Sequence, residues 1–105
     1  MIAAIVQFKL SDDFSAEKAR SAFVDSIPKF VRMNGLIRKY FLLAEDARTA
    51  GAVYLWSDRA SAQAFFTEDW MEFISGKYGF RPGVAYYECP VVVDNHTGEV
   101  ITELN

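Results

Sequence analysis

The chain contains 105 residues, of which 51% are hydrophobic and 15% are aromatic. This length suits a single domain with a single core, and the aromatic content excludes an intrinsically disordered chain. The net charge is −3 and no run of Lys or Arg is longer than a pair, so we expect neither nucleic acid nor a membrane surface as a partner.

Cysteine usage and the N-terminal residues indicate a cytoplasmic protein. Cys89 is the single cysteine of the chain, which excludes an internal disulfide and is typical of a reducing compartment. The apolar residues 2–6 are too few to span a membrane, and they lack the basic flank of a signal peptide. We therefore expect neither a membrane span nor a secretory leader.

The first third of the chain predicts a strand, a kinked helix and the start of a second strand. Residues 2–9 read as a strand with Ile2, Ala4, Val6 and Phe8 on one face and Gln7 and Lys9 on the other. A helix is expected to begin after the N-cap Ser15, to kink at Pro28, and to end at Asn34-Gly35. Its apolar face is predicted to comprise Ala19, Ala22, Phe23, Ile27, Phe30 and Val31.

The middle of the chain predicts a hairpin followed by a second helix. Residues 36–43 and 50–56 are rich in strand formers and are separated by a polar turn. Ser57 or Asp58 caps the second helix. Its inner face is predicted to comprise Ala62, Phe65 and Phe66. The apolar pattern resumes after residues 67–69, which we interpret as a separate helical turn.

The last part of the chain predicts a fourth strand and a tail. The strand is expected to cover residues 84–93, in which Pro90 indicates an edge position or a bulge. After a turn, residues 99–104 are again rich in strand formers. They predict either a fifth short strand or an arm that reaches onto a partner.

The order of these elements, β-α-β-β-α-β, predicts an α+β fold with the ferredoxin-like split motif over residues 1–94 and a tail over residues 95–105. Two helices cover only one face of such a sheet. The stretch GAVYLW at residues 51–56 does not alternate apolar and polar residues, as a strand with one face in water should. We therefore expect the uncovered face to pack against a second copy, forming a homodimeric α+β barrel.

Residues 35–66, GLIRKYFLLAEDARTAGAVYLWSDRASAQAFF, resemble the core of the YdhR-like monooxygenase family. The matching positions are Gly35, Lys39, Ala50, Gly51, Tyr54, Leu55, Asp58, Ser61, Ala62 and Ala64. Phe41 stands where a tryptophan of the family is expected. That family belongs to the dimeric α+β barrels that include antibiotic-biosynthesis monooxygenases. The resemblance implies a homodimer whose two sheets close into a barrel, and a monooxygenase-like activity.

Aromatic density is the main functional signal in the residues themselves. Aromatic side chains from both helices and three strands should converge between the helices and the sheet, where they either fill the core or rim a pocket for a flat apolar ligand. The predicted pocket residues are Tyr40, Tyr54, Trp56, Phe66 and Trp70. A structure without a cavity above roughly 100 Å³ would favour a purely structural role.

Few ionisable residues are candidates for chemistry. Arg38, on the same strand face as Tyr40, or Lys39, on the other face, could stabilise an anion; the alternative is a solvated rim or an interface pair. Glu88 could act as a base, although an edge-strand charge that aids solubility explains it as well.

The sequence predicts no metal and no cofactor. His96 lies in a polar turn, which predicts an exposed imidazole, and Cys89 lies in a strand, which predicts a small buried hydrophobe; together they do not form a metal-ligand set. No glycine-rich loop follows a strand in the way that phosphate binding requires.

Three functions remain open. The first is a cofactor-independent monooxygenase that acts on, or binds, a small aromatic or polyketide-like molecule such as a hydroquinone or enol. The second is a non-catalytic small-molecule-binding or stress-related dimer. The third is an isomerase- or lyase-type enzyme with a proton shuttle. A buried ionisable group discriminates between them, because an isomerase requires one and a binding protein does not.

Overall fold

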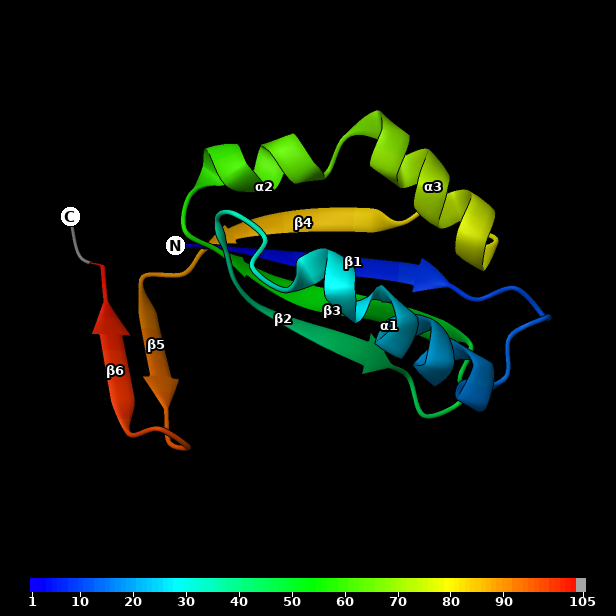
Figure 1. Ribbon diagram of the computed structural model, residues 1–105, viewed down its shortest axis with the longest axis horizontal. Helices are drawn as coiled ribbons and strands as arrows, with labels where there is room; N and C mark the ends of the chain where they lie inside the picture. Colours follow the sequence, from blue (N-terminus) through cyan, green and yellow to red (C-terminus); the bar gives the residue numbers. More distant parts are fainter. Residues whose placement is uncertain (104–105) are drawn as a thin grey trace.

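The computed structural model describes residues 1–103 and contains a four-stranded antiparallel sheet, three helices and a separate two-stranded hairpin (Figure 1). In chain order the elements are β1 (Ile2–Lys9), α1 (Ala16–Phe30), β2 (Leu36–Leu43), β3 (Thr49–Trp56), α2 (Arg59–Phe65), α3 (Glu68–Tyr78), β4 (Gly83–Glu88), β5 (Val91–Asp94) and β6 (Glu99–Thr102). The strand order in the main sheet is β2-β3-β1-β4. The predicted α+β class and the β2–β3 hairpin are confirmed.

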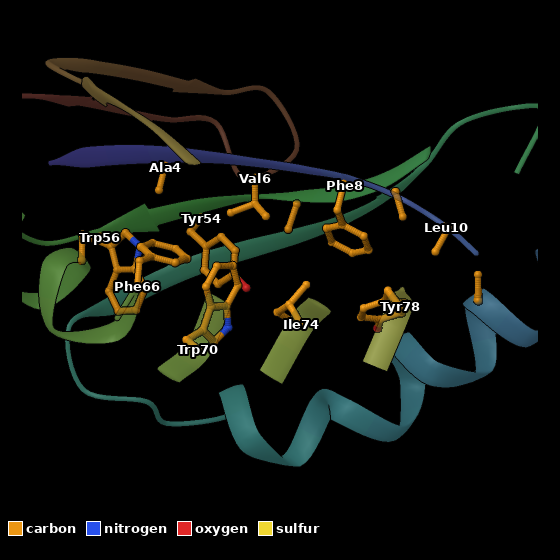
Figure 2. Packing of buried hydrophobic residues seen from close by; sticks show 14 of the residues in the cluster. Ala4, Val6, Phe8, Leu10, Tyr54, Trp56, Phe66, Trp70, Ile74 and Tyr78 are labelled. Atoms are coloured by element: carbon orange, nitrogen blue, oxygen red, sulfur yellow. The ribbon is translucent and has the colours of Figure 1, made fainter. Parts of the chain in front are cut away.

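The core lies between the inner face of this sheet and the helices, which all cover that same face (Figure 1). In β1 every second side chain is buried, which is the alternation that the sequence predicts. Figure 2 shows Ala4, Val6 and Phe8 pointing from β1 toward the helices. Between them lie Ile5 and Gln7, which face away from the helices and are exposed. Within the described part of the chain, no helix covers the opposite face of the sheet (Figure 1).

Helix α1 begins as predicted but ends earlier. The Ser15 hydroxyl oxygen accepts a hydrogen bond from the Lys18 backbone N–H at 3.1 Å. The helix ends at Phe30, before the expected Asn34-Gly35 cap: Val31 is extended, with ψ of 125°, and Arg32 follows in a left-handed backbone conformation with φ of 63°. The predicted apolar face is too wide: Ile27 and Val31 are exposed, while the rest of the stripe packs on the core.

Helix α2 begins at the predicted cap, and the expected helical turn after it is a full helix. The Asp58 carboxylate accepts a hydrogen bond from the Ser61 N–H at 2.7 Å. In α3 the Thr67 hydroxyl accepts from the Trp70 N–H at 3.2 Å, and the helix runs for 11 residues. Gly79, with φ of 105°, ends it. A capped start and acidic residues in the first turn sustain α3 where the sequence predicted one turn.

The predicted strand over residues 84–93 is interrupted at Cys89-Pro90, because proline cannot donate a ladder hydrogen bond. The chain then forms the β5–β6 hairpin, which projects from one end of the sheet (Figure 1). Of the two predictions for the tail, the structure shows the short strand; residues 104–105 lie outside the described residues. Two ion pairs connect this part of the chain to the sheet. Arg38 Nη2 lies 2.6 Å from Asp94 Oδ2, and the N-terminal ammonium lies 2.7 Å from Glu103 Oε2.

The longest of the described helices, α1, has 15 residues, and no helix in residues 1–103 combines the length and the apolar character needed to cross a membrane.

Candidate functional site

A cavity of about 180 Å³ lies between the helices and the inner face of the sheet. Its walls are mostly aromatic: Phe8, Phe23, Phe30, Phe41, Tyr54, Trp70, Phe73 and Tyr78. On β3 it is lined by Gly51, which has no side chain, and by Ala52, whose methyl group is small. The volume exceeds the roughly 100 Å³ below which a purely structural role would be favoured.

Lys39 places its amine inside this aromatic cavity. It lies opposite Tyr54 in the β2–β3 register, so both side chains point toward the helices. The Lys39 Nζ is 3.4 Å from the ring centroid of Phe30, 4.0 Å from that of Phe41 and 4.5 Å from that of Tyr54. None of the ion pairs within residues 1–103 includes Lys39. The amine is therefore held by the faces of three rings rather than by an acid.

The surroundings of Lys39 lower the pKa of its amine from 10.5 to about 7. Burial is the main cause, because removal from water disfavours the charged form. The positive charges of Lys29 and Lys77 act in the same direction. Near neutral pH a substantial fraction of Lys39 is consequently a free amine, which can accept a proton.

Lys29 and Lys77 both lie close to the ring of Phe73, which is 53% exposed. The Lys29 Nζ is 5.1 Å from the Phe73 ring centroid, and the Lys77 Nζ is 5.8 Å from it. Both lysines line the cavity, and no Asp or Glu among residues 1–103 does so. The site is thus apolar in its walls and cationic in its charged groups.

The two tyrosines of the cavity remain protonated. Burial raises the pKa of Tyr54, and the nearby Tyr78 raises it further. Burial also raises the pKa of Tyr78. Near neutral pH these hydroxyls can donate hydrogen bonds, but they are not bases. Lys39 is the group with basic character in this cavity.

Four of the five predicted pocket residues lie together on the inner side of the sheet. Tyr54 and Trp70 line the cavity, and Figure 2 shows Trp56 and Phe66 next to them in the core. Tyr54 stacks on Trp56 with the ring centroids 5.9 Å apart, and Phe66 meets Tyr54 edge to face at 4.9 Å. The Trp56 indole N–H is buried and has no acceptor among the described residues. Trp56 and Phe66 do not line the cavity, but they pack against Tyr54, which does.

Tyr40 and Arg38 lie outside this cavity, on the opposite face of the sheet. Tyr40 is paired with Val53, is 52% exposed and points away from the helices. Arg38 donates to Asp94 at 2.6 Å and to the Tyr40 hydroxyl at 3.3 Å. The placement of Tyr40 between helices and sheet was therefore wrong, because neighbouring strand residues alternate faces and Lys39 takes the inner position. Arg38 binds a carboxylate of the hairpin.

The other candidates from the sequence lie away from the cavity. Glu88 is exposed at the end of β4, and His96 is exposed in the turn of the hairpin. Cys89 is half-buried, with its Sγ 3.7 Å from the Val91 carbonyl oxygen. No group of three or more His, Cys, Asp and Glu residues among residues 1–103 is placed to hold a metal ion.

Sequence reasoning missed Lys29 and Lys77 as site residues. The signal was helical spacing: Lys77 follows Phe73 by four residues, which places both on one face of α3. Lys29 directly precedes Phe30, the last residue of α1. A lysine close to an aromatic residue is so common on helix surfaces that these two did not stand out.

Solved structures share this fold at low sequence identity. A protein of unknown function from Nitrosomonas europaea is 15% identical with a TM-score of 0.66, and 84% of this chain covers 87% of that chain. A "putative antibiotic biosynthesis monooxygenase" from Bordetella bronchiseptica is 17% identical with a TM-score of 0.64. The match covers 84% of this chain and 95% of that chain. SnoaB from Streptomyces nogalater, a cofactor-independent oxygenase, is 14% identical with a TM-score of 0.60. The match covers 84% of this chain and 91% of that chain.

No curated protein sequence matches the chain. The family model described as "putative mono-oxygenase ydhR" matches residues 4–78, which include the sheet from β1 to β3, all three helices and every residue that lines the cavity. The resemblance noted in residues 35–66 is thereby confirmed and extended, and the chain belongs to the YdhR mono-oxygenase family.

Proposed function

We propose that this protein is a cofactor-independent monooxygenase that acts on a small electron-rich aromatic or polyketide-like molecule in the cavity. The observation that carries the proposal is Lys39, a basic amine enclosed by aromatic rings. The family match and the likeness to SnoaB support the same reaction class. Fold likeness alone would not be enough, since one fold serves many functions.

The reaction requires only a base and an apolar site from the protein. An enol or hydroquinone transfers its acidic proton to the neutral Lys39 amine, and the resulting ammonium stabilises the substrate anion. The anion passes one electron to O₂, and the two radicals combine into a peroxide. Loss of water from the peroxide leaves a new carbonyl group, so one oxygen atom enters the product and the other leaves as water. The apolar walls keep bulk water from the anion.

The test of this reaction is oxygen uptake without added cofactor. We expect hydroquinones or anthrones to consume O₂ in the presence of the protein and a metal chelator. Lys39→Met should lower the rate at least about 100-fold, the usual contribution of a general base. Lys9→Met, which removes an exposed lysine on the other face of the sheet, should keep the rate. Binding of these compounds without oxygen uptake would contradict the proposal and would indicate a non-catalytic binding protein.

A second candidate is an isomerase- or lyase-type enzyme, favoured by the same residue. Lys39 is the buried ionisable group that a proton shuttle requires. Such an enzyme would exchange a substrate C–H for solvent deuterium and would consume no oxygen. Mass spectrometry of the substrate recovered from D₂O, with the oxygen electrode run in parallel, separates the two reactions.

We also propose that the ferredoxin-like sheet pairs with that of a second copy to form a homodimeric α+β barrel. Support comes from large apolar side chains on the helix-free face, where Ile5 is 37% exposed, Leu42 46% and Tyr87 55%. Sedimentation velocity should give the mass of a dimer. Leu42→Lys should give a monomer, whereas Val24→Lys, at an exposed apolar position of α1, should leave the dimer intact. A wild-type monomer at micromolar concentration would contradict the assembly.

A further inference from the structure

The cavity of the proposed oxygenase holds three amines and no acid among the described residues. Lys29 comes from the last turn of α1, Lys77 from the last turn of α3, and Lys39 from β2. Three separate elements therefore bring like charges to one apolar space. Like charges at close range destabilise one another unless an opposite charge joins them.

The size of the cavity restricts what could supply that opposite charge. A cavity of about 150 Å³ in a protein core accommodates benzene, and this one measures about 180 Å³. It is therefore large enough for one aromatic ring with small substituents. The rings of Phe30, Tyr54 and Trp70 provide flat apolar surfaces for such a ligand.

We propose that the substrate is a single-ring aromatic carboxylate, whose ring lies between the aromatic walls and whose carboxylate is bound by the Lys29, Lys39 and Lys77 amines. The inference rests on the proposed function in using the same cavity, and it adds the charge and the size of the substrate. The three amines have no negatively charged partner in the cavity among the described residues, and the carboxylate of the substrate would supply one. A neutral ligand of equal shape would leave their mutual repulsion in place.

Binding of an anion should be coupled to proton uptake at Lys39. The charged and titratable groups near its amine are Lys29 from α1, Lys77 and Tyr78 from α3, and Tyr54 from β3. The two other lysines disfavour the protonated form of Lys39, whereas a bound carboxylate favours it. Above pH 7 the complex should therefore take up a proton, and the affinity should fall as pH rises from 7 to 9. Below pH 6 Lys39 is already charged and the uptake should vanish. Only the fraction of the complex in which Lys39 is neutral can accept the hydroxyl proton, so turnover of a carboxylate substrate should rise with pH over the range in which its affinity falls.

Gentisate, a hydroquinone that carries one carboxylate, and its neutral amide are a matched pair of probes. Calorimetric titrations under nitrogen, at pH 8 and low salt, in two buffers of different ionisation enthalpy, measure both affinity and proton uptake. We expect gentisate to bind at least about tenfold more tightly than the amide, since a charge-assisted hydrogen bond is worth at least that factor. Uptake should be about half a proton or more for gentisate alone.

Three variants test the role of the lysines. Lys39→Met should remove the proton uptake and most of the preference for gentisate. Lys29→Gln and Lys77→Gln, at the exposed rim, should each weaken gentisate about threefold to tenfold and leave the amide unchanged. Lys18→Gln is the matched control, because Lys18 also lies over an aromatic ring, that of Phe14 at 4.9 Å, but outside the cavity. The two rim variants test the preference for gentisate over the amide independently of Lys39→Met.

The outcomes separate this inference from the proposed reaction. Equal or tighter binding of the amide, or no binding of either probe, overturns the inference. Oxygen uptake with the amide alone would keep the oxygenase proposal and reject the anion site. Tight gentisate binding with proton uptake, but without oxygen consumption in air, supports the anion site and counts against the oxygenase.

Discussion

Replacing Gly51 by alanine is expected to lower the free energy of unfolding by about 3 kcal/mol or more, the upper range for overpacking a core. Gly51 lies in β3 opposite Gln7 of β1. An added Cβ would collide with the Val6 carbonyl oxygen and would lie 3.0 Å from the Val6 carbonyl carbon and 3.2 Å from the Gln7 Cα. These are backbone atoms of the neighbouring strand, so the clash cannot be relieved by a side-chain rotation. Urea denaturation followed by tryptophan fluorescence measures the loss.

Gly76→Ala is the matched control for this substitution. Gly76 lies within α3, and a Cβ there would meet no heavy atom within 4 Å. Alanine in a helix is more stable than glycine by about 0.5–1 kcal/mol, so this variant should gain stability. A Gly51→Ala protein as stable as the wild type would show that β1 and β3 are not packed as closely as described.

The stability of the protein is expected to rise with pH between about 7 and 10.5, because of Lys39. Its pKa is about 7 in the folded protein and 10.5 ordinarily, so in this window the unfolded chain binds more protons than the folded one. The free energy of unfolding should therefore increase with pH, by at most about 1.4 kcal/mol per unit. Below pH 7 Lys39 is protonated in both the folded and the unfolded protein, so the full cost of burying its ammonium is present. Above pH 10.5 Lys39 is neutral in both, and this cost is absent.

Lys39→Met removes this cost and should be more stable than the wild type at pH 7, on the order of 2–3 kcal/mol after allowance for solvent screening. The difference between the two proteins should shrink as pH rises to 9.5. Urea denaturation at fixed protein concentration and at several pH values measures it. Comparing the two proteins cancels the titration of Tyr54 and Tyr78, which both contain. A difference that stays constant from pH 7 to 9.5 would contradict a lowered pKa for Lys39.

Local sequence signals predicted most element boundaries well. Ser15 and Asp58 are caps in the structure as expected, because an N-cap needs only a side-chain oxygen and the next few backbone N–H groups. The strand predicted over residues 84–93 was too long, because Pro90 interrupts it after β4. Helix α3 is longer than the single turn predicted, because the Thr67 cap and the acidic first turn stabilise it.

The site was predicted less completely than the fold. Tyr54 and Trp70 were expected in a pocket and line the cavity. Tyr40 was chosen for its aromatic ring although Lys39, on the other strand face, is the residue that points inward. Lys29 and Lys77 gave no distinctive pattern, because their importance comes from meeting Lys39 across three separate elements.

The sequence alone determined the α+β class, the order of the elements and the excess of apolar side chains over what two helices can cover. These properties depend on periodicity and on capping, which act within a few residues. Only the tertiary structure decided that Lys39 lies in an aromatic cavity that no Asp or Glu of residues 1–103 lines, and that Arg38 lies against Asp94. Proximity between distant segments, and the desolvation that it imposes on an amine, arises when sheet and helices pack, and no local pattern encodes it.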